Sequence, residues 1–253
     1  MSKLSVCLLT HNSMRTLERC LIPTLSVADE MVVVDSGSSD GSLEFLRNHG
    51  VEPIHWPYKT HASQMNFAID RANNDWVLCL DSDEFLDAGI LQAITELKPR
   101  LDDPAVGYRL QRYWKVLGRE VRAIYPVTSP DLPLRLFNRT RVRFNDQPVD
   151  DKATGAVRRV VLPGRVTHDT FYSLHEIFGK LNSYTSRLVQ YRNVTPSLLR
   201  ALVSPAFAFA KWYFRKGAWR DGAVGLVTGI YASLYTFLKY FKAWCRERRL
   251  PLE

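Results

Sequence analysis

The chain has no cysteine pair at metal-binding or redox spacing. Its cysteines lie at positions 7, 20, 79 and 245, too far apart for a Cys-x-x-Cys motif. We therefore predict reduced thiols in a cytosolic protein, with Cys7 and Cys79 inside apolar strands. The first apolar run begins at Leu4, and no basic leader or cleavage site precedes it. A signal peptide is therefore not predicted.

Two phosphate-binding motifs are also missing. No Gly-x-Gly-x-x-Gly follows the first apolar run, and no glycine-rich loop ends in Gly-Lys-Ser or Gly-Lys-Thr. A Rossmann dinucleotide site and a P-loop are therefore poorly supported. A nucleotidyltransferase would also need a glycine-rich basic loop after the first strand, so it is the less favoured alternative.

Evenly spread positive charge is absent, although the formal net charge is +8. Residues 1–197 hold 24 Lys and Arg against 23 Asp and Glu, whereas residues 198–253 hold 10 against 3. The basic character belongs to the C-terminal segment, so we predict no nucleic-acid partner. The longest uncharged stretch there, Gly222 to Leu238, has 17 residues, fewer than the roughly 20 of a typical spanning helix.

Short apolar runs alternate with helical patterns in the first part of the chain. This alternation predicts an α/β fold with a doubly wound sheet. We expect strands at Leu4 to Thr10, Met31 to Asp35, Val51 to Trp56 and Trp76 to Leu80. We expect helices from Met14 to Leu25, after Asp40, and from Thr60 to Ala72.

The run from Trp76 to Leu80 ends at Asp81-Ser82-Asp83-Glu84. Residues two apart in extended chain point the same way, so both aspartates can meet beyond the strand. Mg²⁺ usually takes one or two carboxylates and completes its shell with water and phosphate oxygens, so the motif predicts a metal-bridged diphosphate. Asp-x-Asp also occurs on solvated loops, but three acids in four residues would repel one another unless a cation lay between them.

Other polar residues follow the neighbouring strands. Thr10 and Asn12 come after the first, and Asp35 ends the second. Because the carboxyl ends of parallel strands share one edge, we expect a single polar crevice there. Asp35 could accept a hydrogen bond from a nucleoside or cap its own turn, and the two roles are compatible.

These motifs together resemble glycosyltransferase family 2, whose members are inverting enzymes with the GT-A fold. The resemblance is carried by Thr10-x-Asn12, Asp35-Ser36-Gly37-Ser38-Ser39-Asp40-Gly41, Gln64-x-Asn66 and Asp81-Ser82-Asp83. Within the family the chain is most similar to lipopolysaccharide core glucosyltransferases. The resemblance implies a GT-A domain over residues 1–197 with a mixed sheet, a UDP-sugar donor, Mg²⁺ or Mn²⁺, and a glycolipid acceptor.

The family pattern also implies roles for single residues. It places Thr10 and Asp35 against the uridine, Asp81 against the ribose or the metal, and Asp83 on the metal that bridges the diphosphate. The remaining residues implied to bind the nucleotide sugar are Asn12, Gln64 and Ser82.

A candidate general base lies in an acidic loop. Similar family members carry Val-His-Glu where this chain has Val149-Asp150-Asp151, and the acid of that motif serves as the base. A base is needed because the attacking sugar hydroxyl must lose its proton. Asp151 is the first candidate and Asp150 the second, and a solvated turn capped by aspartate remains the alternative.

A histidine late in the chain is a candidate metal ligand. His168 ends a predicted strand, Val166 to Asp169, and the resemblance implies that it completes the metal's coordination. A lone histidine is more often a structural residue.

The segment 198–253 is basic, aromatic and amphipathic. Basic residues interleaved with interfacial aromatics fit a helical pair that lies in the headgroup region of an anionic membrane. We therefore expect a peripheral protein on the inner face of the cell membrane. A helical cover for the sheet, an oligomer interface and a non-catalytic membrane scaffold are the alternatives.

Overall fold

The computed structural model describes residues 2–251, which form two compact units. Residues up to 112 together with 132–168 form the first, and residues 113–131 together with those from 169 onward form the second. The predicted boundary at residue 197 differs from this division. The helix from 174 and the segment 113–131 belong with the C-terminal helices because they pack on them.

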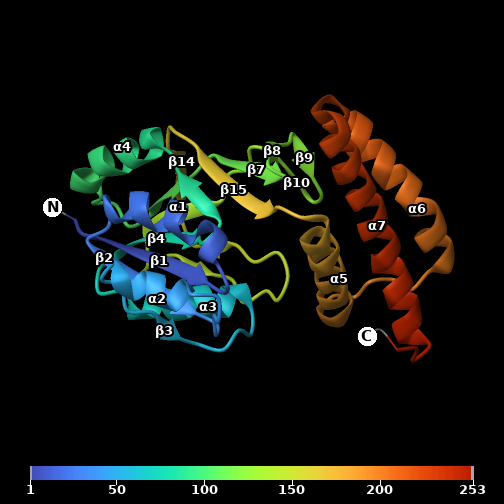
Figure 1. The fold of residues 1–253 in the computed structure, drawn as a ribbon, viewed down its shortest axis with the longest axis horizontal. Coiled ribbons are helices and arrows are strands. Elements are labelled where there is room, and N and C mark those ends of the chain that lie inside the picture. Colours follow the sequence, from blue (N-terminus) through green and yellow to red (C-terminus); the bar gives the residue numbers. More distant parts are fainter. Residues whose placement is uncertain (1, 252–253) are drawn as a thin grey trace. The chain divides into compact units, whose positions relative to one another are not determined.

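A seven-stranded mixed sheet is the centre of the first unit (Figure 1). Its order is β14-β6-β11-β4-β1-β2-β3. Strands β1 to β4 run parallel, and β11 is antiparallel to both β4 and β6. The predicted doubly wound mixed sheet is confirmed. The strands are β1 (Leu4–Thr10), β2 (Glu30–Asp35), β3 (Ile54–His55), β4 (Trp76–Asp81), β6 (Val106–Arg109), β11 (Leu134–Asn138) and β14 (Arg158–Val161).

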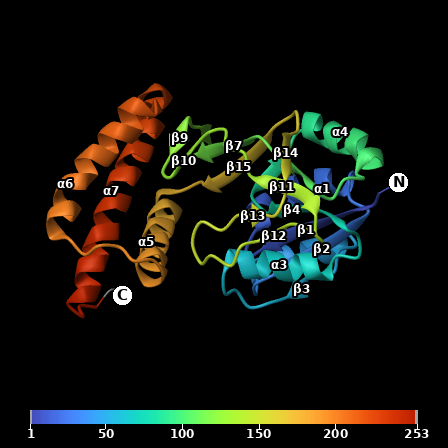
Figure 2. The same cartoon turned by 180° about the vertical axis from the view of Figure 1, so that it is seen from behind.

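Helices cover both faces of this sheet, because its central strands are apolar on both sides. Leu4, Val6 and Leu8 of β1 join one cluster, whereas Cys7 and Leu9 join the other. The first cluster is closed by α1 (Met14–Leu25), α2 (Ser42–Asn48) and α4 (Ala88–Leu97). The second is closed by α3 (His61–Arg71) and the hairpin β12 (Arg143–Phe144) and β13 (Ala153–Thr154) (Figure 2).

A second strand pair lies beside the Asp-Ser-Asp turn. Strand β5 (Glu84–Leu86) pairs antiparallel with β15 (Val166–Phe171), which places His168 opposite Glu84. The late histidine therefore reaches the Asp-Ser-Asp turn through strand register. Residues 106–120 contain β6, β7 (Arg112–Val116) and β8 (Arg119–Glu120).

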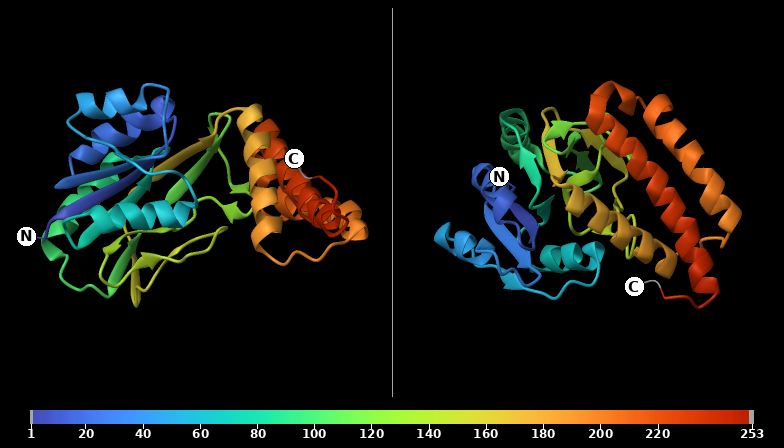
Figure 3. Two further views of the ribbon diagram at one scale, coloured as in Figure 1. Left: turned by 90° about the horizontal axis from the view of Figure 1, so that it is seen from below. Right: turned by 45° about the vertical axis from the view of Figure 1, so that its right-hand side comes forward.

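Three long helices dominate the second unit (Figure 3). They are α5 (Leu174–Tyr191), α6 (Leu198–Ala210) and α7 (Gly222–Glu247), beside the short hairpin β9 (Ala123–Ile124) and β10 (Val127–Thr128). Helices α6 and α7 lie side by side, joined by a π-helical turn (Lys211–Arg215) and a 3₁₀ turn (Ala218–Asp221). A glycine permits the close contact of α7 with the 3₁₀ turn: a Cβ at Gly225 would lie 1.7 Å from the Ala218 carbonyl oxygen.

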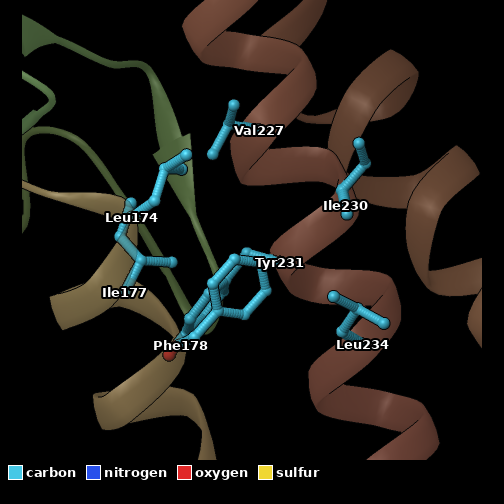
Figure 4. A pocket seen from close by; sticks show the side chains of 7 residues that line it. All are labelled: Leu174, Ile177, Phe178, Val227, Ile230, Tyr231 and Leu234. Atoms are coloured by element: carbon cyan, nitrogen blue, oxygen red, sulfur yellow. The ribbon is translucent and has the colours of Figure 1, made fainter.

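An apolar pocket of about 150 Å³ lies between α5 and α7 (Figure 4). Its lining is Leu174, Ile177, Phe178, Val227, Ile230, Tyr231 and Leu234. Over residues 2–251, no helix has the length and apolar character needed to cross a bilayer.

Candidate active site

The carboxyl ends of β1, β2 and β4 meet as expected. Strand register sets Thr10 beside Asp35 and Leu9 beside Asp81, so polar residues from three strands share one edge. Thr10 is 3% exposed, and its hydroxyl has no hydrogen-bond partner among the described residues. A buried polar atom without a partner is costly, so this hydroxyl is suited to a ligand.

Asp35 caps the turn that follows its strand. Its Oδ1 accepts hydrogen bonds from the backbone N–H groups of Gly37 (2.7 Å) and Ser38 (2.8 Å). Gly37 has a φ of +103°, a conformation that favours glycine, and this lets the turn bend back onto the carboxylate. The turn-capping role is therefore present, and the contact with uridine stays a prediction.

Asn12 and Ser82 connect the loops around the crevice. Asn12 Oδ1 accepts from the backbone N–H of Ser39, and the Asn12 N–H donates to Ser38 Oγ, each at 2.8 Å. Ser82 Oγ lies 2.7 Å from Ser13 Oγ. These bonds fix the loops after β1, β2 and β4 against one another, so the two residues shape the crevice.

Gln64 of α3 is bonded to the loop after β2. It is 2% exposed, and its amide donates to Ser36 Oγ at 2.6 Å. In this arrangement it supports the loop after β2. Its predicted contact with the nucleotide sugar is untested.

Asp81 is held between two cations that the sequence did not suggest. His61 Nε2 donates to its Oδ1 at 2.9 Å, and Arg135 Nη2 donates to its Oδ2 at 2.8 Å. Burial alone raises the pKa of Asp81, but His61 and Arg135 outweigh it and hold that pKa well below its usual range. Asp81 therefore stays ionised, and both of its oxygens are already bonded.

Glu84 lies beneath this pair and is fully buried. Arg135 hydrogen-bonds its Oε1, and Arg112 contacts the same oxygen at 2.6 Å. The expectation that the acids repel one another unless a cation separates them is met here by guanidinium groups of the chain. Burial alone lowers the pKa of Arg135, but the attraction of Glu84 and Asp81 outweighs burial and raises that pKa above its usual range, so the guanidinium remains charged.

His61 also contacts the candidate base. Its Nδ1 donates to Asp151 Oδ2 at 2.7 Å, so one imidazole joins Asp81 and Asp151. Both ring nitrogens face carboxylates, which accept only, so both carry protons. Burial lowers the pKa of His61, but Asp81 and Asp151 more than compensate and raise it to about 10. The imidazole is a cation at neutral pH.

The two candidate bases differ in position. Asp151 is brought into the crevice, and its side chain is 16% exposed. Asp150 is exposed and has a left-handed backbone, with φ +59°. The loop is pinned at its ends, where Asn145 exchanges hydrogen bonds with Lys152. The arrangement favours Asp151 over Asp150, and the catalytic role of either is untested.

Asp83 and His168 form a second pair. His168 Nε2 lies 3.2 Å from Asp83 Oδ1, and the histidine is 8% exposed. A carboxylate and an imidazole at this distance can turn toward one cation. Among residues 2–251 no three His, Cys, Asp or Glu side chains converge as a complete cation site. An incomplete set fits an ion that takes its other ligands from a diphosphate and water. Asp81 fits less well because its oxygens are engaged.

Comparison with known proteins identifies the family. The profile described as Glycosyl transferase family 2 matches residues 5–162. The chain belongs to this family. It is a glycosyltransferase with the GT-A fold, as the resemblance implied.

Relatives match almost the whole chain. A lipopolysaccharide core biosynthesis glycosyltransferase, LpsC of Rhizobium meliloti (strain 1021), is 26% identical over 262 residues, covering 96% of this chain and 93% of its own. An uncharacterised glycosyltransferase of Rickettsia prowazekii (strain Madrid E) is 24% identical, covering 96% and 87%. Among solved structures, a mannosyltransferase from Pyrobaculum calidifontis in complex with GDP-Man and Mn²⁺ aligns with a TM-score of 0.52 at 17% identity, covering 98% and 87%.

Sequence analysis missed His61 and Arg135. His61 lies in the helix expected from Thr60 to Ala72. The position of His61 in the first turn of this helix was predictable, because Thr60 is a typical N-cap residue. In the structure Thr60 accepts a capping hydrogen bond from the Ser63 N–H, and α3 starts at the carboxyl edge of the sheet. Arg135 carried no such signal, because its approach to Asp81 depends on β11 inserting beside β4.

Proposed function

We propose that this glycosyltransferase transfers a hexose, with glucose the first candidate, from a UDP-sugar to a hydroxyl of a membrane glycolipid. Lipopolysaccharide core is the acceptor class we favour, and the site of action is the inner face of the cell membrane. The observation that carries the proposal is the chain of contacts from Asp81 through His61 to Asp151. It puts a base candidate beside the crevice predicted to hold the donor.

The relatives support the choice of acceptor and a nucleotide sugar as the class of donor. The name of LpsC connects that protein with lipopolysaccharide core, and its length is matched almost end to end. The Pyrobaculum enzyme contains GDP-Man and Mn²⁺, which supports a nucleotide sugar and a divalent cation. The choice of uridine rests on the resemblance of Thr10 and Asp35 to the family pattern.

The proposed chemistry is a single displacement. The acceptor hydroxyl gives its proton to the Asp151 carboxylate as its oxygen attacks the anomeric carbon. The bond between that carbon and the diphosphate oxygen breaks, and the configuration inverts. His61 holds Asp151 by a hydrogen bond, so the carboxylate keeps one orientation as the proton arrives.

Negative charge accumulates on the departing diphosphate. Asp83 and His168 are the residues that would hold a Mg²⁺ or Mn²⁺ ion at this point. Such an ion supplies electrostatic stabilisation of the leaving group when bound. Arg135 and Arg112 are bonded to carboxylates of the chain, so they keep the floor of the crevice neutralised.

A donor screen tests this proposal. UDP-, GDP-, ADP- and dTDP-sugars are offered with and without Mn²⁺ to the wild type and to Asp83→Asn. Asp75→Asn is the matched control, because that side chain is 64% exposed and lies outside the crevice. We expect Mn²⁺-dependent binding or slow hydrolysis of one UDP-sugar, lost in Asp83→Asn and kept in Asp75→Asn.

Two outcomes would contradict the proposal. Preference for another nucleotide would overturn the choice of donor. Binding of no nucleotide sugar would favour a non-catalytic scaffold, an alternative suggested by Asp150-Asp151 in place of the usual His-Glu pair and by the ion pairs that occupy Asp81.

A further inference from the structure

Helix α6 carries an apolar face that nothing in the described chain covers. Six residues follow the i, i+3, i+4 pattern of one helix face, and all six are exposed: Leu199, Leu202, Val203, Ala206, Phe207 and Ala210. The largest are open to solvent, with Leu199 71%, Leu202 65% and Phe207 72% exposed. Apolar side chains grouped in this way indicate an interaction surface. We call these six residues the α6 face.

The other side of α6 packs within its own unit. Ala201 is fully buried. In the π-helical turn, Trp212 is 6% exposed and meets Tyr125 edge to face at 5.3 Å. Phe209 lies so near α7 that a Cβ at Gly229 would come within 3.0 Å of its ring. One side of α6 is therefore packed on the rest of the unit. The α6 face is the opposite side, which no part of the described unit covers.

Positive charge borders the α6 face. Residues 198–220 contain no acid, and their five basic residues are all exposed: Arg200, Lys211, Arg215, Lys216 and Arg220. Arg200 and Lys211 are eleven residues apart, about three helical turns, so they lie along one flank of α6. None of the five forms an ion pair with a carboxylate of residues 2–251.

Aromatic residues stand at the end of the same segment. Phe214 is 61% and Trp219 is 50% exposed. The Arg220 guanidinium lies 5.2 Å from the centre of the Trp219 ring. Indole rings beside cationic side chains are typical of the boundary between headgroups and acyl chains.

We propose that the α6 face docks on the surface of an anionic lipid bilayer. Leucine and phenylalanine side chains enter the acyl boundary, and the flanking Arg and Lys side chains contact lipid phosphates. A second copy of this chain fits less well. A symmetric pairing of two such faces would set five cations against five, with no acid between residues 198 and 220 to offset them.

This inference deepens the proposed function, since an enzyme seated in this way would meet a glycolipid acceptor at its headgroup. It is tested without donor or acceptor. Failure to bind vesicles would leave the donor screen unaffected, and an inactive donor site would leave vesicle binding unaffected.

The test is flotation of the full chain with vesicles of phosphatidylcholine alone or with about one third phosphatidylglycerol. Leu202→Glu/Phe207→Glu places charge on the α6 face. Val157→Glu/Val161→Glu is the matched control, because Val157 is 81% and Val161 44% exposed and neither belongs to α6. We expect the wild type and the control to float with anionic vesicles. The α6 variant should lose about tenfold or more in affinity.

A second variant addresses the charge without touching the apolar residues. Arg200→Glu/Lys211→Glu should also weaken binding to anionic vesicles, and high salt should weaken the wild type in the same way. Thermal unfolding checks that each variant folds. If Leu202→Glu/Phe207→Glu does not fold, Arg200→Glu/Lys211→Glu serves as the test in its place.

Three results would overturn the proposal. One is a wild type that floats no better with anionic vesicles than with neutral ones. Another is a pair of variants that float as well as the wild type. The third is a wild-type dimer, seen by light scattering, that Leu202→Glu/Phe207→Glu dissociates while vesicle binding is unchanged, which would make the face a contact between copies.

Discussion

At the scale of single residues, the crevice is organised by charges that cancel. Asp81 is neutralised by His61 and Arg135, and Glu84 is neutralised by Arg135 and Arg112. A buried carboxylate would otherwise be costly. The acids that looked like one metal cluster therefore divide into two groups. Asp81 and Glu84 form an ion-pair network, while Asp83 pairs with His168, and the metal role of that pair stays a prediction.

His61 gives this network a pH dependence. Its pKa is raised from 6.5 to about 10 in the folded chain. A raised pKa contributes stability that is fully present below about pH 6.5 and is lost as the pH rises through about 10. We predict that the free energy of unfolding of the wild type falls over this window relative to His61→Gln. Denaturant unfolding of both chains from pH 6 to pH 10 measures the difference, and parallel profiles would contradict the protonated bridge.

At the scale of elements, the sequence predicted best those helices with a single apolar face and those strands formed by a single apolar run. The helix from Met14 to Leu25 and the strand from Leu4 to Thr10 have their predicted bounds. The strand expected over 51–56 shortens to Ile54–His55 at the edge of the sheet, where it has one partner. Strand β14 was not predicted, because its four residues are exposed and have no apolar alternation.

Long-range pairing explains what the sequence could not show in the site. The partners of Asp81 and Asp83 come from β11, β15 and the first residue of α3. That first residue, His61, also bonds Asp151 in the loop between β12 and β13. No local pattern specifies that these segments meet. The residues at strand ends were predictable because the carboxyl edge of a parallel sheet is shared, whereas their partners depend on strand order.

Glycines in the helices of the second unit allow a matched test of packing. A Cβ at Gly225 in α7 would clash with the Ala218 backbone, whereas a Cβ at Gly179 in α5 would meet nothing within 4 Å. We predict that Gly225→Ala destabilises the chain by about 1–3 kcal/mol. Gly179→Ala should stabilise it by up to about 1 kcal/mol. Thermal unfolding gives both values, and equal effects would contradict the close contact of α7 with the 3₁₀ turn.

At the scale of the whole molecule, the chain joins a family 2 fold to a second unit built mainly from the long helices α5, α6 and α7. The family profile ends at residue 162, before α5 to α7 begin. LpsC nevertheless aligns across 96% of the chain, so the likeness extends into the helical unit. We propose donor chemistry for the first unit and a bilayer contact for the second.

The most direct test of the central claim concerns the base. Asp151→Asn keeps the size of the side chain and removes its ability to take a proton, while Asp150→Asn makes the same change one residue away. The measurement is the single-turnover rate of transfer from the donor found in the screen to a glycolipid extract, with donor affinity measured alongside. We predict a fall of about 10²–10⁴-fold for Asp151→Asn, with donor affinity kept and Asp150→Asn near the wild type. Full transfer activity in Asp151→Asn would contradict the account.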